Sequence, residues 1–190
     1  MIALTGGIAT GKSTVLRALE NLGARTVSAD AIVRAMYEEP WVQDRLAAIT
    51  GLANPILPRD AAPIILGNPE KMRRYGAIFH QPALERILAS GADVAEVPLL
   101  VESCSMGLFE RVWGTVCAPE AQYERLIARL HDPEAAKRFL DAQFSSRVKA
   151  AFCETVIRTD EPFQHVVTRV SQVWQLRVAE AENLCYTRVA

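Results

Sequence analysis

Short apolar segments alternate along the chain with longer segments in which apolar residues recur every three or four positions. The short segments are rich in valine and predict β-strands, whereas the longer ones predict amphipathic helices. We expect strands at Ile2–Leu4, Arg25–Ser28, Asp93–Val97, Val112–Cys117 and Thr155–Arg158. Strands that alternate with helices form parallel sheets, so the pattern predicts an α/β fold with a five-stranded parallel sheet flanked by helices.

Two longer regions depart from simple alternation. The stretch from Ala31 to Gly91 contains helical patterns and proline-rich interruptions but no convincing strand, which indicates a helical insertion between the second and third strands. The last helix is expected at Phe163–Leu184, and its valines, Val166 and Val170 among them, share one side and should pack on the sheet. An insertion of this kind in a nucleotide-binding fold often carries the second substrate, an argument from fold analogy.

A glycine-rich loop follows the first strand. Its sequence, Gly6-Gly7-Ile8-Ala9-Thr10-Gly11-Lys12-Ser13, fits the pattern G-x-x-x-x-G-K-[ST]. Glycines let the backbone curl so that its N–H groups point inward, and the helix that starts near Lys12 directs its positive end to the same place. The residues expected to bind nucleotide phosphates are Gly7, Ile8, Ala9, Thr10, Gly11, Lys12, Ser13 and Thr14.

Within this loop, Lys12 should reach the outer phosphates, and the Ser13 hydroxyl should hold a magnesium ion. An ordinary glycine turn between a strand and a helix is the alternative. The apolar strand before the loop and the leucine-bearing helix after it, which Gly23 should end, favour the phosphate site.

Composition narrows the class of protein. The 190 residues are 50% hydrophobic and 23% charged, with a formal net charge of −1, which fits one globular α/β domain and gives nucleic-acid binding no bulk electrostatic support. No apolar run is long enough to cross a membrane and the first strand leaves no room for a signal peptide, so we expect a cytoplasmic protein. The cysteines, Cys104, Cys117, Cys153 and Cys185, are widely spaced and predict reduced thiols, not a zinc site or disulfides.

Two acidic residues stand at predicted strand ends. Asp30 follows the second strand, and Glu96 closes the third. In an open parallel sheet, residues just past the carboxyl ends of strands face the ligand, so Asp30 could orient a substrate hydroxyl and Glu96 could meet magnesium. The alternatives are that Asp30 caps the following helix and that Glu96 pairs with a lysine at the sheet edge.

Arginines mark the helices after the fourth strand. Arg125 and Arg129 fall on one helical face with Gln122, and Arg138 lies in the next helix, beyond the break at His131-Asp132-Pro133. A guanidinium matches two phosphate oxygens at once, so these arginines could clamp ATP. The alternative is that these arginines only form a solvent-exposed face of the helix.

Taken in order, these segments resemble the dephospho-coenzyme A kinase family across almost the whole chain. The resemblance is carried by LTGGIATGKSTV, VSADAIVR, PRDAAPIILGNPEK, FHQP, VPLLVE and APEAQYERLIAR, and by Gln143 at the place of a later family glutamine. It implies a P-loop nucleoside-triphosphate-hydrolase-like fold with a helical substrate-binding insertion and a helical lid. The implied division is a nucleotide-binding core of residues 1–30, 92–118 and 153–190, an acceptor-binding insertion of residues 31–91, and a lid with connecting helices at residues 119–152.

The resemblance also implies the reaction, which is transfer of the γ-phosphate of ATP, with magnesium, to the 3′-hydroxyl of dephospho-coenzyme A. Asp30 would orient or deprotonate that hydroxyl, while Lys12 and Arg129 would balance the charge on the phosphoryl oxygens. The acceptor-side residues would be Arg34, Arg59, His80, Leu99 and Glu102, and the metal would meet Ser13 and Glu96. The implied partners are small molecules, with no nucleic acid or membrane, and the protein would be a monomer or a weak homo-oligomer.

The chain departs from the family pattern at several positions. Ala9 stands where glycine is common, Ser28 replaces the first acid of D-A-D, and Gln81 separates His80 from Pro82. Residues 159–161, Thr-Asp-Glu, lack the asparagine and glycine of the loop that would border adenine. These departures keep two alternatives open: another small-molecule kinase with a P-loop, acting on a nucleoside or similar alcohol, and a nucleotide-binding module without catalysis.

Overall fold

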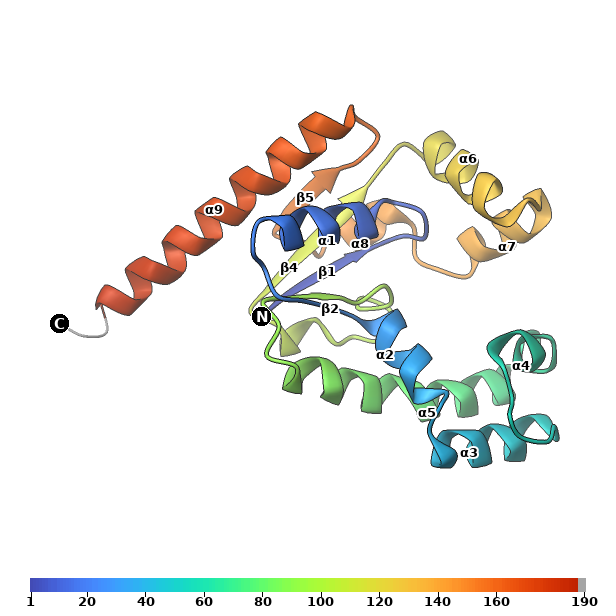
Figure 1. Cartoon of the computed structure of the whole chain (residues 1–190). Helices are drawn as coiled ribbons and strands as arrows, with labels where there is room; N and C mark the ends of the chain where they lie inside the picture. Colours follow the sequence, from blue (N-terminus) through green and yellow to red (C-terminus); the bar gives the residue numbers. More distant parts are fainter. Residues whose placement is uncertain (188–190) are drawn as a thin grey trace. The chain divides into compact units, whose positions relative to one another are not determined.

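The computed structural model describes the backbone of residues 1–187 and the side chains of residues 1–180 (Figure 1). Its strands are β1 (Ile2–Gly6), β2 (Thr26–Ser28), β3 (Val94–Glu96), β4 (Arg111–Val116) and β5 (Thr155–Arg158). They form a five-stranded sheet in the order β2-β3-β1-β4-β5. The sequence prediction of five strands, at nearly these positions, is confirmed.

Parallel pairing brings the carboxyl ends of the strands to one edge of the sheet. β1 pairs in parallel with β3 and β4, and β4 pairs in parallel with β5. In this register Leu4 faces Glu96, and Gly6 faces Thr115. The loops that follow β1, β3, β4 and β5 therefore leave the sheet at the same edge, where ligands bind in open α/β sheets.

Apolar residues of the sheet pack against α1 (Lys12–Asn21) and α9 (Phe163–Thr187). Figure 1 shows the long helix α9 running beside α1, and the two helices are in contact. Val166, Val170 and Val173 of α9 are buried with Trp113 of β4 in this core. The predicted packing of the α9 valines on the sheet is confirmed.

The chain divides into two compact units, a larger one of residues 1–26 and 92–190 and a smaller one of residues 27–91. The smaller unit contains α2 (Ala29–Met36), α3 (Pro40–Thr50), α4 (Pro58–Ile65) and α5 (Pro69–Ala89). Its own core includes Met36, Leu46 and Phe79, and the Phe79 ring stacks on Tyr37 with centroids 5.0 Å apart. The expectation of helices between the second and third strands is confirmed.

The remaining helices of the larger unit are the 3₁₀ turn η1 (Met106–Leu108), α6 (Pro119–Leu130), α7 (Pro133–Asp141) and α8 (Ser146–Ala150). Pro119 and Pro133 occupy first turns, where proline loses no hydrogen bond. Between α6 and α7, His131 takes a left-handed conformation and the Asp132 carboxylate accepts a hydrogen bond from the Ala135 N–H at 3.0 Å. The predicted break in the helical pattern lies at this point.

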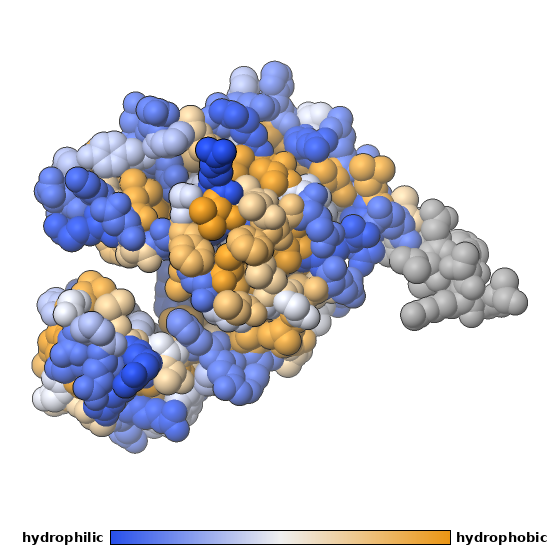
Figure 2. Space-filling view, turned by 180° about the vertical axis from the view of Figure 1, so that it is seen from behind, coloured by the Kyte–Doolittle hydropathy of each residue, from blue (hydrophilic) through white to orange (hydrophobic). Residues whose placement is uncertain are grey.

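The side chains of Cys104, Cys117 and Cys153 are free thiols, and that of Cys185 lies outside the described residues. Within the described part of the chain, no three His, Cys, Asp or Glu side chains come together as a metal site. No described helix is long and apolar enough to cross a membrane. Figure 2 shows apolar side chains gathered on one face of the larger unit, and exposed apolar residues of this unit include Leu108, Phe144 and Phe152.

Candidate active site

The loop from Gly6 to Thr14, here called the phosphate loop, has a backbone with left-handed positions. Ala9 has a φ of 60° and Gly11 a φ of 85°. Gly11 is also the N-cap of α1, which has no side-chain cap and no acidic residue in its first turn. An α-helix that starts in this way presents backbone N–H groups and the positive end of its dipole to a ligand, which suits an anion.

Two glutamine side chains hold the peptide groups on both sides of Ile8. The Nε2 of Gln122 on α6 donates to the carbonyl oxygen of Ile8 at 2.7 Å, and the Ile8 N–H donates to Oε1 of Gln143 at 3.2 Å. Ser146 donates from Oγ to Oε1 of Gln122 at 3.3 Å and so fixes that amide. The left-handed conformation of Ala9, which costs about 1–2 kcal/mol for a residue with a Cβ, is thus held by its surroundings.

The side chains of Thr115 and Thr159 hold Thr10 of the phosphate loop. The Thr10 hydroxyl lies 2.7 Å from the Thr115 hydroxyl at the end of β4 and donates to the Gly7 carbonyl at 2.7 Å. Thr159, which follows β5, donates from Oγ1 to the carbonyl oxygen of Thr10 at 2.7 Å. A Cβ on Gly11 would stand 3.0 Å from the Thr159 side chain, so the loop and the end of β5 are tightly packed.

Lys12 supplies the positive charge of the site. Its side chain is 8% exposed, and Nζ donates to the carbonyl oxygens of Gly6 at 3.1 Å and Gly7 at 2.9 Å. An ammonium that lies across the loop, beside the start of α1, can exchange these carbonyl contacts for phosphate oxygens. The arrangement suits an anion and has the features expected of a site for nucleotide phosphates.

Hydrogen bonds connect Arg125 of α6 to the segment that follows β5. The Arg125 guanidinium donates to the Thr159 carbonyl at 2.7 Å and to the Thr159 hydroxyl at 3.2 Å. Asp160 accepts a hydrogen bond from the Ala118 N–H at 2.9 Å, and Arg158, 2.8 Å from its Oδ1, holds the pKa of this carboxyl below its usual value. Thr159 and Asp160 therefore link the phosphate loop to α6.

The other sequence-predicted residues of the larger unit lie in several environments. Ser13 is exposed in the first turn of α1, and Glu96 is half-buried at the end of β3. Arg129 is exposed in the last turn of α6, while Arg138 on α7 has its Nη2 3.9 Å from the Asp132 carboxylate.

Leu99 and Glu102 belong to the segment after β3. The Leu99 side chain is 38% exposed, whereas Glu102 forms an ion pair with Lys149, with Nζ and Oε1 2.8 Å apart. Glu102 therefore already has a charged partner inside the protein.

The smaller unit carries the remaining predicted residues. Asp30 is exposed in the first turn of α2, whose N-cap is Ser28, so the alternative that Asp30 caps this helix is wrong. Arg34, Arg59 and His80 are exposed on α2, α4 and α5. Exposed charged groups of this kind are available to a ligand.

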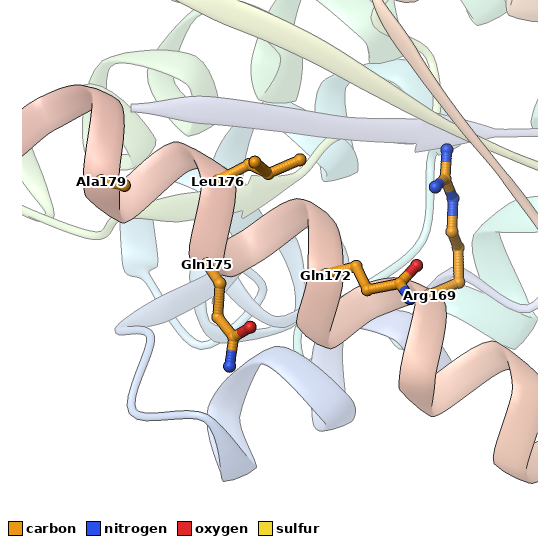
Figure 3. Close-up of a pocket in the computed structure, with 5 residues that line it drawn as sticks. All are labelled: Arg169, Gln172, Gln175, Leu176 and Ala179. Atoms are coloured by element: carbon orange, nitrogen blue, oxygen red, sulfur yellow. The ribbon is translucent and has the colours of Figure 1, made fainter.

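A surface hollow of about 410 Å³ lies along α9 (Figure 3). Its lining comes from that helix alone and consists of Arg169, Gln172, Gln175, Leu176 and Ala179. These residues are all exposed, and Arg169 is the charged member. The hollow has no desolvated polar group and no convergence of segments, so the phosphate loop remains the candidate active site.

Comparison with known proteins agrees with this geometry. A family model described as dephospho-CoA kinase matches residues 1–53. A dephospho-CoA kinase of Geobacter metallireducens is 33% identical to this chain, in an alignment that covers 94% of this chain and 96% of the relative. The chain belongs to the dephospho-CoA kinase family. The similarity predicted from the sequence motifs is confirmed.

Solved structures support the fold. TT1252 from Thermus thermophilus has a TM-score of 0.79 at 23% identity, covering 93% of this chain and 96% of the other. A dephospho-CoA kinase from Campylobacter jejuni has a TM-score of 0.66 at 23% identity, covering 92% and 94%. The P-loop kinase fold expected from the sequence is confirmed.

Several residues that build the site were not among the sequence-predicted binding residues. Thr115 is the next-to-last residue of β4 and Thr159 directly follows β5, both at the sheet edge that carries the phosphate loop, a position rule that could have identified both. The spacing of Gln122 puts it on one helical face with Arg125 and Arg129, and the family resemblance singles out Gln143, but neither glutamine is predicted to bind the phosphate loop. No pattern of the sequence places Ser146 or Lys149 beside them, because both lie on the five-residue helix α8.

We expect Thr159→Val to weaken ADP binding about tenfold, measured by isothermal titration calorimetry. Valine keeps the shape but removes the hydroxyl, which leaves the Thr10 carbonyl without its 2.7 Å partner and Arg125 with one acceptor fewer. A lost buried hydrogen bond of this kind costs about 1–2 kcal/mol. Thr159→Ser, which keeps the hydroxyl, is the control, and a valine variant that binds ADP like the wild type would contradict the role of Thr159.

Proposed function

We propose that this chain transfers the γ-phosphoryl group of ATP to the 3′-hydroxyl of dephospho-coenzyme A, giving coenzyme A and ADP. The observation that carries the proposal is the braced phosphate loop with Lys12 folded across it, in a chain of the dephospho-CoA kinase family. Transfer of a phosphoryl group needs mainly positioning and electrostatic stabilisation, and the loop supplies both.

The nucleotide side of the reaction is supported by contacts within the larger unit. The uncapped start of α1 and the Lys12 ammonium suit the β- and γ-phosphates. Arg125 is fixed by Thr159 at the border of the loop, and Arg129 lies one helical turn further along α6. On this proposal Arg129 and Arg138 approach the phosphates from the lid, residues 119–152, when ATP is bound.

A magnesium ion fits the chemistry of the site. The Ser13 hydroxyl stands in the first turn of α1, and Glu96 ends the neighbouring strand β3. Magnesium is commonly bound by one or two protein oxygens together with substrate phosphates and water, so the Ser13 hydroxyl and the Glu96 carboxylate are suitable ligands. When bound, the ion would neutralise charge on the phosphates.

The acceptor side is proposed from the family pattern. Asp30, which follows β2, would accept the proton of the ribose hydroxyl, and its exposure leaves its carboxylate available to a substrate. Arg34, Arg59 and His80 would bind the acceptor from the smaller unit, with Leu99 and Glu102 contributing from the segment after β3. The cytoplasmic location and the monomeric or weakly oligomeric state stay predictions.

The direct test is to incubate the protein with Mg-ATP and dephospho-coenzyme A and to measure the acceptor by mass spectrometry. We expect the acceptor to gain one phosphate, and we expect Lys12→Ala to reduce the rate at least about a hundredfold because it removes charge stabilisation of the transferred group. Arg169→Ala, which removes an exposed cationic side chain of α9 outside the lid, is the control and should leave the rate unchanged.

The other outcomes separate the alternatives. Binding of ATP without any product would favour a nucleotide-binding module that has lost catalysis. Phosphorylation of a nucleoside or a similar alcohol, with no reaction of dephospho-coenzyme A, would indicate a different small-molecule kinase.

We expect Asp30→Asn to lower turnover at least about a hundredfold and to leave ADP affinity within a factor of two. The amide keeps the size of the side chain but cannot accept the proton in the transition state. Steady-state kinetics and calorimetry measure the two quantities separately. A variant that loses ADP affinity as strongly as turnover would show that Asp30 supports the nucleotide site instead of acting on the acceptor.

A further inference from the structure

Lys149 on α8 is a lysine inside the protein. Its side chain is 1% exposed, which places it among the most deeply buried side chains of the described chain. A buried ammonium is costly unless it is paired and hydrogen-bonded. Lys149 has both kinds of partner, since Nζ lies 2.7 Å from the Pro98 carbonyl oxygen and 2.8 Å from Oε1 of Glu102.

The first of these partners lies beside the phosphate loop. The Pro98 carbonyl also accepts a hydrogen bond from the Thr5 hydroxyl at 3.3 Å, and the Val97 N–H donates to the Leu4 carbonyl at 2.9 Å. Thr5 directly precedes Gly6, whose carbonyl accepts from Lys12. Lys149 thus binds the segment after β3 at Pro98, where that segment contacts the end of β1 just before the phosphate loop.

The second partner closes a ring of contacts. Oε1 of Glu102 accepts from Lys149 and also from the Phe144 N–H at 3.1 Å. Phe144 follows Gln143, whose Oε1 accepts from the Ile8 N–H of the phosphate loop. The segment after β3, the segment between α7 and α8, and the phosphate loop are therefore connected through the Lys149–Glu102 pair.

The pair is arranged poorly if its purpose is stability alone. Oε1 of Glu102 takes both donors, whereas Oε2 is buried and has no hydrogen-bond partner among the described residues. A buried acceptor without a partner costs stability, and well-packed apolar side chains often replace a buried ion pair without loss. A buried ion pair is therefore weak evidence for added stability, and what its contacts do is join α8 to the segment after β3.

We propose that Lys149 is a positioning residue of the kinase, which acts through Glu102 and Pro98 to hold the acceptor-side segment of residues 97–105 against the phosphate loop. The inference rests on the proposed kinase function. Both partners of Lys149 are protein groups, so its effect reaches the substrates through the segment that carries Leu99 and Glu102. Loss of Lys149 should therefore impair phosphoryl transfer and use of the acceptor, not nucleotide affinity.

The test compares Lys149→Met, Lys149→Arg and the double variant Lys149→Met/Glu102→Met, with Arg169→Met, an exposed cationic residue of α9 outside the lid, as the control. We expect Lys149→Met to lower kcat at least tenfold, to raise the KM for dephospho-coenzyme A, and to keep the Kd for ADP within twofold. Lys149→Arg, which keeps charge and donors, should recover part of kcat, and the control should equal the wild type.

The double variant separates positioning from stability. Removing both charges should restore the urea-unfolding midpoint lost in Lys149→Met, while amide exchange at Ser103 and Ser105 stays faster than in the wild type, a readout of the segment's position that does not depend on Glu102 itself contacting the acceptor. If kcat recovers together with stability, or if folded Lys149→Met keeps wild-type kcat, the positioning role is wrong. Should Lys149→Met fail to fold, the double variant carries this comparison alone.

Failure of the proposed reaction would be recognised separately, because the wild type would then give no product. The positioning inference would in that case be decided by amide hydrogen exchange at Ser103 and Ser105, whose N–H groups bond to the Leu99 and Leu100 carbonyls. Faster exchange in the double variant than in the wild type would support it. Equal exchange would overturn it.

Discussion

The candidate site depends on how the backbone around Ile8 is held. The loop needs a left-handed residue at Ala9, where a Cβ makes that conformation unfavourable, and two side-chain amides fix the peptide groups before and after Ile8. Gln122 comes from α6 and Gln143 from the segment before α8, so helices distant in sequence determine the conformation of the loop. These contacts are all made between groups of the protein, and a loop that the protein's own contacts hold needs less ordering when a ligand binds.

Side-chain contacts also hold the segment after β5, where the sequence differs from the pattern expected for the family. Thr159 stands where the family resemblance leads us to expect an asparagine, and its hydroxyl donates to the Thr10 carbonyl and accepts from Arg125. The Asp160 carboxylate accepts a hydrogen bond from the Ala118 N–H at the start of α6. The segment after β5 therefore still links the phosphate loop to the helix that carries the arginines, through different side chains.

Much of the fold was accessible from the sequence because it follows local patterns. The strands, the phosphate loop and the burial of Val166 and Val170 on α9 come from apolar periodicity and glycine placement. The side chains that hold the loop could not be predicted from local patterns. Gln122, Gln143 and Thr159 are more than 100 residues away from their loop partners in the sequence, and only the folded chain brings them together. Lys149 was missed for a related reason: α8 has five residues, too few to show a helical period, so nothing local distinguishes a buried lysine from a solvated one.

The central claim is that the protein holds its phosphate loop in the binding conformation without nucleotide. Amide hydrogen exchange at Ile8, followed by NMR in the free and ADP-bound protein, measures this directly because the Ile8 N–H donates to Gln143. The account predicts clear protection in the free protein, little change with ADP, and loss of protection in Gln143→Ala. Unprotected exchange at Ile8 in the free wild type, with protection gained only when ADP binds, would contradict it.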